Sequence, residues 1–294
     1  MMKLPVDQTI HDLLTNKLKA LEKHFKSDVI SYFGPIIDGN ETFFLQVIEQ
    51  LNKTRSKNNC LYIILTTQGG SAFAVERYVN IVRNHYDEVN FIVPDYAYSA
   101  GTIFCLSGNN IHMDYFSVLG PIDPQVQNKE GKWVPALGYL DKVNEMLEKA
   151  KNKTLTQAEF LILKDIDLAE LRAYEQAKEL TISLLKKWLV KYKFKNWTKH
   201  ETTPALLGKD VTDEEKENRA EEIADELGNN KTWKSHGRPI NIETLKNDSK
   251  LRLKIEDFGK IPERRKLIRE YYNLLSDYIK KSGIGIFVHS RRFI

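Results

Sequence analysis

Two stretches decide the fold of this chain: Thr66-Thr67-Gln68-Gly69-Gly70-Ser71 and Tyr98-Ser99-Ala100-Gly101-Thr102. Each stretch follows an apolar, strand-like run, 61–65 for the first and 90–94 for the second, and each opens a helix-like run. Consecutive strand-to-helix junctions of this kind are typical of stacked βαβ units with a parallel sheet. The first junction offers a Gly-Gly backbone, and the second offers a serine flanked by small residues.

The same alternation continues on both sides of these junctions. Apolar residues at helical or strand spacing predict each element. The predicted helices cover 8–26, 41–56, 72–84 and 100–107, and the further strand-like pieces cover 29–33, 110–113 and 117–119.

From about residue 138 the sequence becomes helical. A helix is predicted over 140–150, and two capping boxes, Thr156 to Glu159 and Thr212 to Glu215, start longer ones. The first of these runs to about residue 193, and Gly228 ends the second. The chain is therefore expected to have an N-terminal helix over 1–27, an α/β core over 28–195 and a helical C-terminal extension over 196–294.

Composition argues against several classes of protein. The net charge of +4 comes from 44 basic and 40 acidic residues that are interspersed, which does not favour nucleic acid as a partner. Cys60 and Cys105 have no second cysteine or histidine at metal-ligand spacing, so we expect neither a disulfide framework nor a metal site. No apolar window reaches the length of a signal peptide or of a membrane span, which predicts a cytoplasmic protein.

The two junctions together suit acyl-transfer chemistry. A serine at a helix N-terminus lies in a positive local field, and a glycine pair lets bare N–H groups approach a developing oxyanion. Simpler interpretations are a helix-capping role for Ser99 and an ordinary turn at Gly69-Gly70. No Gly-Lys-Ser/Thr follows the glycines, which argues against a phosphate-binding loop. The Gly-x-Ser-x-Gly pattern is absent, because residue 97 is Ala.

Three motifs in this order, Thr67–Ala72, Ala97–Thr102 and Gly120–Gln125, resemble the serine dehydrogenase proteinase family. That family belongs with the signal-peptide-peptidase-A-like and Clp-type serine peptidases. The resemblance is strongest over 28–150, and Lys234–Ile240 extends it to most of the chain. It implies a ClpP/crotonase-like fold, peptide substrates, a homo-oligomer and no cofactor.

The resemblance also implies residue roles. Ser99 is the expected nucleophile, and the backbone of Gly69, Gly70 and Ala100 is the expected oxyanion hole. Clp-type peptidases carry a histidine base further along the chain, but the corresponding stretch here contains Ile122-Asp123 and no histidine.

In the signal-peptide-peptidase-A-like enzymes the base is a lysine at the start of a helix. Lys142 matches that position, and burial would let it act as a base near neutral pH. Asp123 suits a turn between two prolines, and the alternative is that it lines the cleft and orients the base or a substrate amine. His236 suits a helix cap, and the alternative is that it contacts the active site from the C-terminal part of the chain. Both are auxiliary candidates, and Asp123 with His112 or His236 is the next arrangement to test if the Ser99–Lys142 dyad fails.

The expected function is therefore hydrolysis of peptide bonds through an acyl-enzyme. Two alternatives stay open. A catalytically inactive scaffold with the same fold is favoured by the missing triad histidine. A crotonase-type acyl-CoA enzyme uses a similar oxyanion hole, but the sequence offers no specific basic site for coenzyme A.

Overall fold

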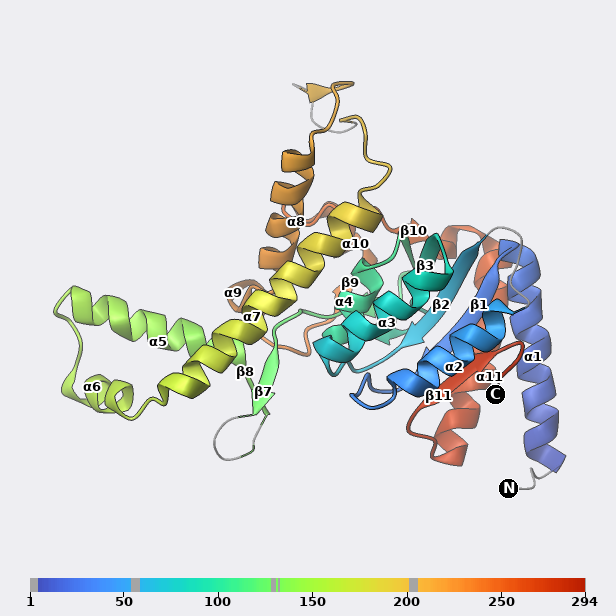
Figure 1. The fold of residues 1–294 in the computed structure, drawn as a ribbon, viewed down its shortest axis with the longest axis horizontal. Helices are drawn as coiled ribbons and strands as arrows, with labels where there is room; N and C mark the ends of the chain where they lie inside the picture. Colours follow the sequence, from blue (N-terminus) through green and yellow to red (C-terminus); the bar gives the residue numbers. More distant parts are fainter. Residues whose placement is uncertain (1–4, 54–58, 128–130, 132, 201–205, 294) are drawn as a thin grey trace.

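The computed structural model describes residues 5–53, 59–127, 131, 133–200 and 206–293. Its centre is a six-stranded sheet in the order β10-β5-β3-β2-β1-β11 (Figure 1). All neighbouring strands are parallel except β11, which pairs antiparallel with β1. The strands are β1 (Asp28–Phe33), β2 (Cys60–Thr66), β3 (Glu88–Ile92), β5 (Asn110–Met113), β10 (Glu256–Asp257) and β11 (Phe287–Ser290). The α/β prediction is confirmed.

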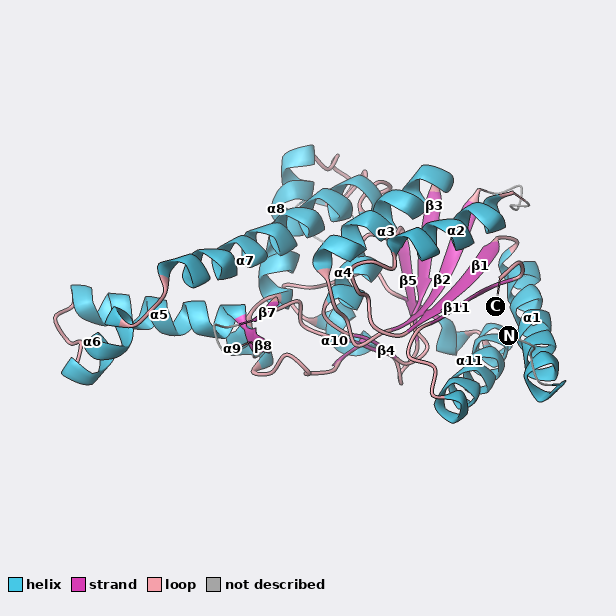
Figure 2. Cartoon of the chain, turned by 60° about the horizontal axis from the view of Figure 1, so that its bottom comes forward, coloured by secondary structure: helices cyan, strands magenta, loops and turns pink. Residues whose placement is uncertain are grey.

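Helices cover both faces of this sheet (Figures 1 and 2). Side chains alternate between the two faces, so that Ile63 of β2 joins one core cluster and Ile64 joins the other. Because both faces are buried, the strands read as continuous apolar runs. One face packs against α2 (Glu41–Asn52), α3 (Ala72–His85) and α4 (Ala100–Leu106), and the other against α1 (Pro5–Phe25) and α11 (Pro262–Ser282).

A long helical arm extends away from the sheet (Figure 2). It consists of α5 (Ala136–Lys151), α6 (Gln157–Lys164) and α7 (Leu168–Trp188), followed by the π-helical turn η1 (Leu189–Lys193). The capping box at Thr156 is confirmed, but the single helix predicted from there to about 193 is wrong. The first helix ends before Asp167. The Asp167 carboxylate caps a new helix by accepting hydrogen bonds from Ala169 N and Glu170 N.

The C-terminal third of the chain is helical in large part. It contains α8 (Asp213–Leu227), α9 (Asn230–Trp233), α10 (Ile242–Asn247), the short 3₁₀ turn η3 (Phe258–Lys260) and α11. The capping box at Thr212 and the helix end at Gly228 are confirmed. This segment also supplies both edge strands of the main sheet, β10 and β11. The division into three domains stays a prediction, and residues 196–294 share one sheet with the core.

Two smaller sheets complete the structure. One has the order β4-β6-β9, formed by β4 (Tyr96–Ala97), β6 (Val118–Leu119) and β9 (Ile240–Asn241). The other is a hairpin of β7 (Gln125–Gln127) and β8 (Trp133–Pro135). The pairing of β6 with β9 brings the segment around residue 240 next to the loop that follows the second junction.

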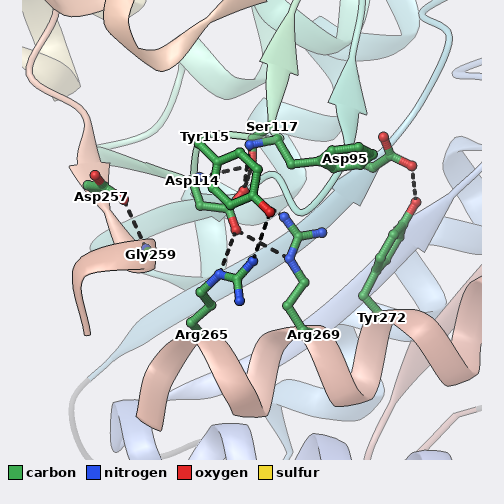
Figure 3. Close-up of polar contacts among 10 residues, drawn as sticks. Asp95, Asp114, Tyr115, Ser117, Asp257, Gly259, Arg265, Arg269 and Tyr272 are labelled. Carbon is green, nitrogen blue, oxygen red and sulfur yellow. Dashed lines mark hydrogen bonds and ion pairs between the residues drawn. The ribbon is translucent and has the colours of Figure 1, made fainter. Parts of the chain in front are cut away.

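Helix α11 is tied to the loops that follow β3 and β5 (Figure 3). Asp114, whose side chain is fully buried, accepts from Arg269 Nη2 at 2.6 Å and from Arg265 Nε at 3.3 Å. Burial would raise the pKa of Asp114, but the hydrogen bond and charge of Arg269 outweigh it and hold that pKa below its usual range. Tyr272 Oη also donates to Asp95 Oδ2 at 2.8 Å. The C-terminal helix thereby fixes the chain on either side of Ser99.

Replacing Arg269 by alanine is expected to destabilise the protein by about 3 kcal/mol, because it leaves a buried carboxylate short of its main partner. The loss should be present above the ordinary pKa of an aspartate, about 3.9, and should fade as pH falls and Asp114 is protonated. Urea unfolding at pH 7 measures it. Lys266→Ala on the same helix, where the lysine side chain is 75% exposed, is the matched control and should change stability by less than about 0.5 kcal/mol. Equal losses in the two variants would contradict the argument.

Candidate active site

Ser99 stands at the turn between β4 and α4 in a strained backbone conformation, with φ 52° and ψ −117°. A positive φ is uncommon outside glycine and costs free energy that the surrounding structure must offset. Thr102 Oγ1 helps to hold the turn, since it lies 2.8 Å from both Ala97 O and Gly120 O and accepts from Gly120 N. The Ser99 side chain makes no capping hydrogen bond to α4. The capping interpretation of Ser99 is therefore wrong.

The Gly69-Gly70 pair lies against this turn. Both glycines have positive φ, +105° and +140°, and a Cβ on Gly69 would stand 2.8 Å from the Ser99 Cβ. Ile36 holds the pair through two backbone hydrogen bonds, Ile36 N to Gly69 O and Ser71 N to Ile36 O. Within the described part of the chain, the N–H groups of Gly70 and Ala100 have no acceptor. The turn that carries Ser99 and the glycine turn packed against it therefore each contribute one backbone N–H without an acceptor among the described residues.

Ser99, Gly70 and Ala100 line one cavity of about 990 Å³. Its volume is at the upper end of the range typical of ligand sites. Among the described lining residues are three carboxylates, Asp38, Asp167 and Glu170, and there is no lysine or arginine. Most of the remaining lining is apolar, contributed by Ile36, Ile37, Phe73, Ile103, Ile122, Val126 and Leu180.

His236 lines the same cavity. Its Nδ1 is buried and has no hydrogen-bond partner in the described structure, and burial lowers the pKa of the imidazole. The N-caps of α9 and α10 are Asn229 and Asn241 and their C-caps are Lys234 and Asp248, so the helix-cap interpretation of His236 is wrong. A neutral imidazole is suited to accept a proton.

Lys142 does not line this cavity. It lies on α5 with its side chain 60% exposed, and its Nζ donates to Glu145 Oε2 at 2.9 Å. The burial that would help a lysine act as a base is absent in this conformation. Its assignment as the base stays a prediction from the sequence.

Asp123 is buried beside the cavity but does not line it. Its Oδ1 accepts from Leu137 N at 3.2 Å in the first turn of α5, and burial raises its pKa to about 6. The Asn230 amide, oriented to satisfy both of its neighbours, donates to Asp123 Oδ2 at 3.3 Å. His112 is buried on β5 against Phe25 and Tyr62, away from the cavity lining, and burial lowers its pKa to about 3.

Sequence reasoning missed the residues that support the site from a distance. Thr102 holds the serine turn, and Asp95 and Asp114 anchor its flanks to α11. Of these residues, only Thr102 was indicated by the sequence, because it belongs to the same short motif as Ser99.

No group of three or more His, Cys, Asp or Glu residues suited to a metal ion occurs among the residues described. Across the described helices, none is long and apolar enough to span a membrane.

A strained serine beside a glycine turn, with unpaired N–H donors and a cavity, is an arrangement that suits a serine hydrolase. The comparison with protein families names the class more closely. Residues 37–206 match the family described as "ClpP-like SDH-type serine proteinase", and the chain belongs to it. This confirms the resemblance seen in the three motifs and supports a peptidase.

The individual relatives add little on activity. The chain is 29% identical over 221 residues to "Uncharacterized protein MJ1495" of Methanocaldococcus jannaschii, a match covering 75% of this chain and 58% of the relative. It is 33% identical over 131 residues to "Uncharacterized protein MJ0137" of the same organism, covering 44% and 41%. The matched region thus spans about half the length of these curated relatives.

Two solved structures are also similar, both at a TM-score of 0.31. One is a serine-to-alanine mutant of "1510-N membrane-bound stomatin-specific protease", with 22% identity over 47% of this chain and 69% of that one. The other is a lysine-to-alanine mutant of the same protease in complex with a substrate peptide, with 24% identity over 50% and 69%. Likeness at this level transfers no residue role to this chain.

Proposed function

We propose that this protein is a serine peptidase that cleaves peptide bonds through an acyl-enzyme. The observation that carries the proposal is the Ser99 turn, which has a strained backbone and a hydroxyl that does not cap its helix. Ser99 Oγ attacks the scissile carbonyl, and the N–H groups of Gly70 and Ala100 stabilise the oxyanion. Gly69 contributes by letting the two junctions approach each other.

Two residues are candidates for the general base that activates Ser99. Lys142 is the candidate from the family pattern, and His236 is the candidate that shares the cavity with Ser99. We favour His236, because it lines the same cavity as Ser99 whereas the Lys142 side chain is exposed, lies outside that cavity and is paired with Glu145. The neutral imidazole accepts the serine proton, gives it to the leaving amine and then activates water. Asp123 supports the start of α5.

A fluorophosphonate probe tests the function directly, since it modifies an activated serine and no ordinary one. We expect one adduct per chain, on Ser99, located by mass spectrometry of peptides. The inactive-scaffold alternative expects no adduct. The acyl-CoA alternative requires cations for the phosphates of coenzyme A, and the described lining of this cavity has no lysine or arginine.

Gly70→Ala is expected to lower turnover of a fluorogenic peptide by at least about a hundredfold, the typical cost of one oxyanion donor. Its Cβ would stand 2.0 Å from Ile36 O, which forces the Gly70 N–H out of place. The matched control is Gly39→Ala, where φ is also positive, +95°, but nothing lies within 4 Å of the added Cβ. A loss below about threefold for Gly70→Ala would mean that the glycine pair is only a turn.

We also propose that the protein is a homo-oligomer. Helix α6 at the tip of the arm has no buried residue, and Phe160, Leu161 and Ile162 are all more than half exposed. Exposed apolar clusters of this kind mark interaction surfaces. Light scattering should give a mass well above 34.1 kDa, and Phe160→Glu with Leu161→Glu should reduce it. Lys164→Glu on the same helix is the control, and a wild-type monomer would refute the proposal.

A further inference from the structure

A second cavity, of about 590 Å³, lies at the opposite end of the main sheet from Ser99. Glu88 and Asn110, the first residues of the parallel strands β3 and β5 (after Asp87 and Asn109), line it, so it lies at the amino ends of those strands. The Ser99 turn follows the carboxyl ends of the same part of the sheet. The two cavities share no lining residue.

The second cavity also has the opposite charge. Its described lining contains two carboxylates, Asp87 and Glu88, and a larger set of lysine and arginine side chains. The Ser99 cavity has carboxylates and no lysine or arginine in its described lining. A concave surface rich in one sign of charge concentrates ligands of the other sign. The cations are Lys193, Lys195, Arg219, Arg252 and Lys254.

Three of these cations, Lys193, Lys195 and Lys254, form no ion pair within the described residues, whereas Arg219 pairs with Glu222. Lys193 Nζ donates to a backbone oxygen, Lys254 O at 3.1 Å, and forms no ion pair within the described residues. An ammonium group has three protons to donate, so further capacity is unused. Burial lowers the pKa of Lys193 to about 8. Lys195 and Lys254 likewise have no ion pair in the part of the chain that the structure describes. An anion in the cavity would offset the cost of gathering these charges.

Aromatic rings line the same cavity, from Tyr192, Phe194 and Trp197. The Trp197 ring meets Phe194 edge-on at a centroid distance of 5.4 Å, and the residue is only partly buried. Aromatic side chains of this kind stack with the bases of nucleotides. The combination of several free cations with an accessible indole suits a ligand that has both a phosphate chain and an aromatic ring.

The backbone around the cavity is irregular at two separate points. The π-helical turn η1 (Leu189–Lys193) brings Tyr192 and Lys193 to the lining, and π-helical turns are frequent at functional sites. Arg252 has a positive φ of 30°, a sparsely populated conformation for a residue with a long side chain. Unusual backbone therefore occurs in two separate segments that line this one charged cavity.

We propose that this cavity binds a nucleoside phosphate, with the phosphates against Lys193, Lys195 and Lys254 and the base stacked on Trp197. The proposal does not depend on the peptidase activity, because it concerns different residues at the other end of the sheet. The site is separate from the nucleophile, so such a ligand acts on the protein as an effector and not as a substrate of Ser99.

Calorimetry on the full chain with ATP, inorganic tripolyphosphate and adenosine tests this site. We expect ATP to bind, and Lys193→Met and Lys254→Met each to weaken it at least about tenfold, as for the loss of a charge-assisted hydrogen bond. Trp197→Leu should weaken ATP at least about fivefold and leave tripolyphosphate unchanged, because only the nucleoside stacks. Lys246→Met removes an exposed lysine outside the cavity and should change nothing.

Two results would overturn the whole proposal, and a third would overturn its nucleoside part. The first is no heat and no rise in Tm at millimolar ATP. The second is ATP binding that neither lysine variant weakens. Equal affinities for tripolyphosphate and ATP would overturn the nucleoside part and leave a polyphosphate site. Lys254 is exposed, so its variant keeps the test valid if Lys193→Met fails to fold.

Discussion

Ser99→Ala is expected to lower peptide hydrolysis by at least about a thousandfold and to abolish labelling by a fluorophosphonate, since loss of a serine nucleophile typically costs that much or more. The fold should survive, because the Ser99 side chain makes no capping bond and the turn is held by Thr102 and backbone hydrogen bonds. A fluorogenic peptide assay and a thermal melt on the same preparation measure the two effects separately.

The matched control is Ser183→Ala, an exposed serine on α7 outside the cavity, whose hydroxyl donates only to Leu180 O in its own helix. Activity should stay within about twofold of wild type there, as for most surface substitutions. Full activity in Ser99→Ala would end the serine-peptidase proposal. A large loss of Tm in that variant would instead mean that the strained turn depends on the hydroxyl.

Elements with strong local patterns were predictable from the sequence. The strands β2 and β3 are apolar runs buried on both faces, and both capping boxes sit at the predicted residues. The edge strands β10 and β11 were missed: β10 has two residues, too few to show a period, and β11 is defined by its antiparallel pairing with β1, a long-range contact that no local pattern predicts. The break before Asp167 was missed because the apolar periodicity runs through it, while the aspartate forms a local cap.

The residues of the candidate site likewise differ in whether the sequence alone could bring them together. The Ser99 turn and the glycine pair are formed by short segments whose residues stay neighbours in the fold, so sequence alone brought them together. The base comes from a distant segment in either interpretation, and its position depends on tertiary packing. The pairing of β9 with β6 brings the His236 segment towards the serine loop, and nothing in the local sequence around His236 predicts that pairing.

Substituting the two candidate bases one at a time is expected to give opposite results for activity. His236→Gln should lower kcat/KM by at least about a thousandfold, because no neutral imidazole then takes the Ser99 proton. Lys142→Met should stay within about threefold, because that ammonium is exposed and paired with Glu145. A peptide assay on both variants, with circular dichroism to confirm folding, decides between them. The reverse pattern would restore the dyad predicted from the sequence.

The pH profile gives an independent answer from the wild-type protein alone. A histidine base must be neutral, so activity rises with pH as the imidazole loses its proton. Burial lowers the pKa of His236 below its ordinary value of 6.5, so the rising limb should lie on the acid side of that value and activity should be level at neutral pH. A free lysine titrates near 10.4, so a lysine base gives a limb at higher pH unless burial lowers its pKa. Activity that is level from about pH 6.5 to 8 therefore agrees with His236 and excludes an exposed lysine as the base, whereas a limb still rising above pH 8 would exclude His236.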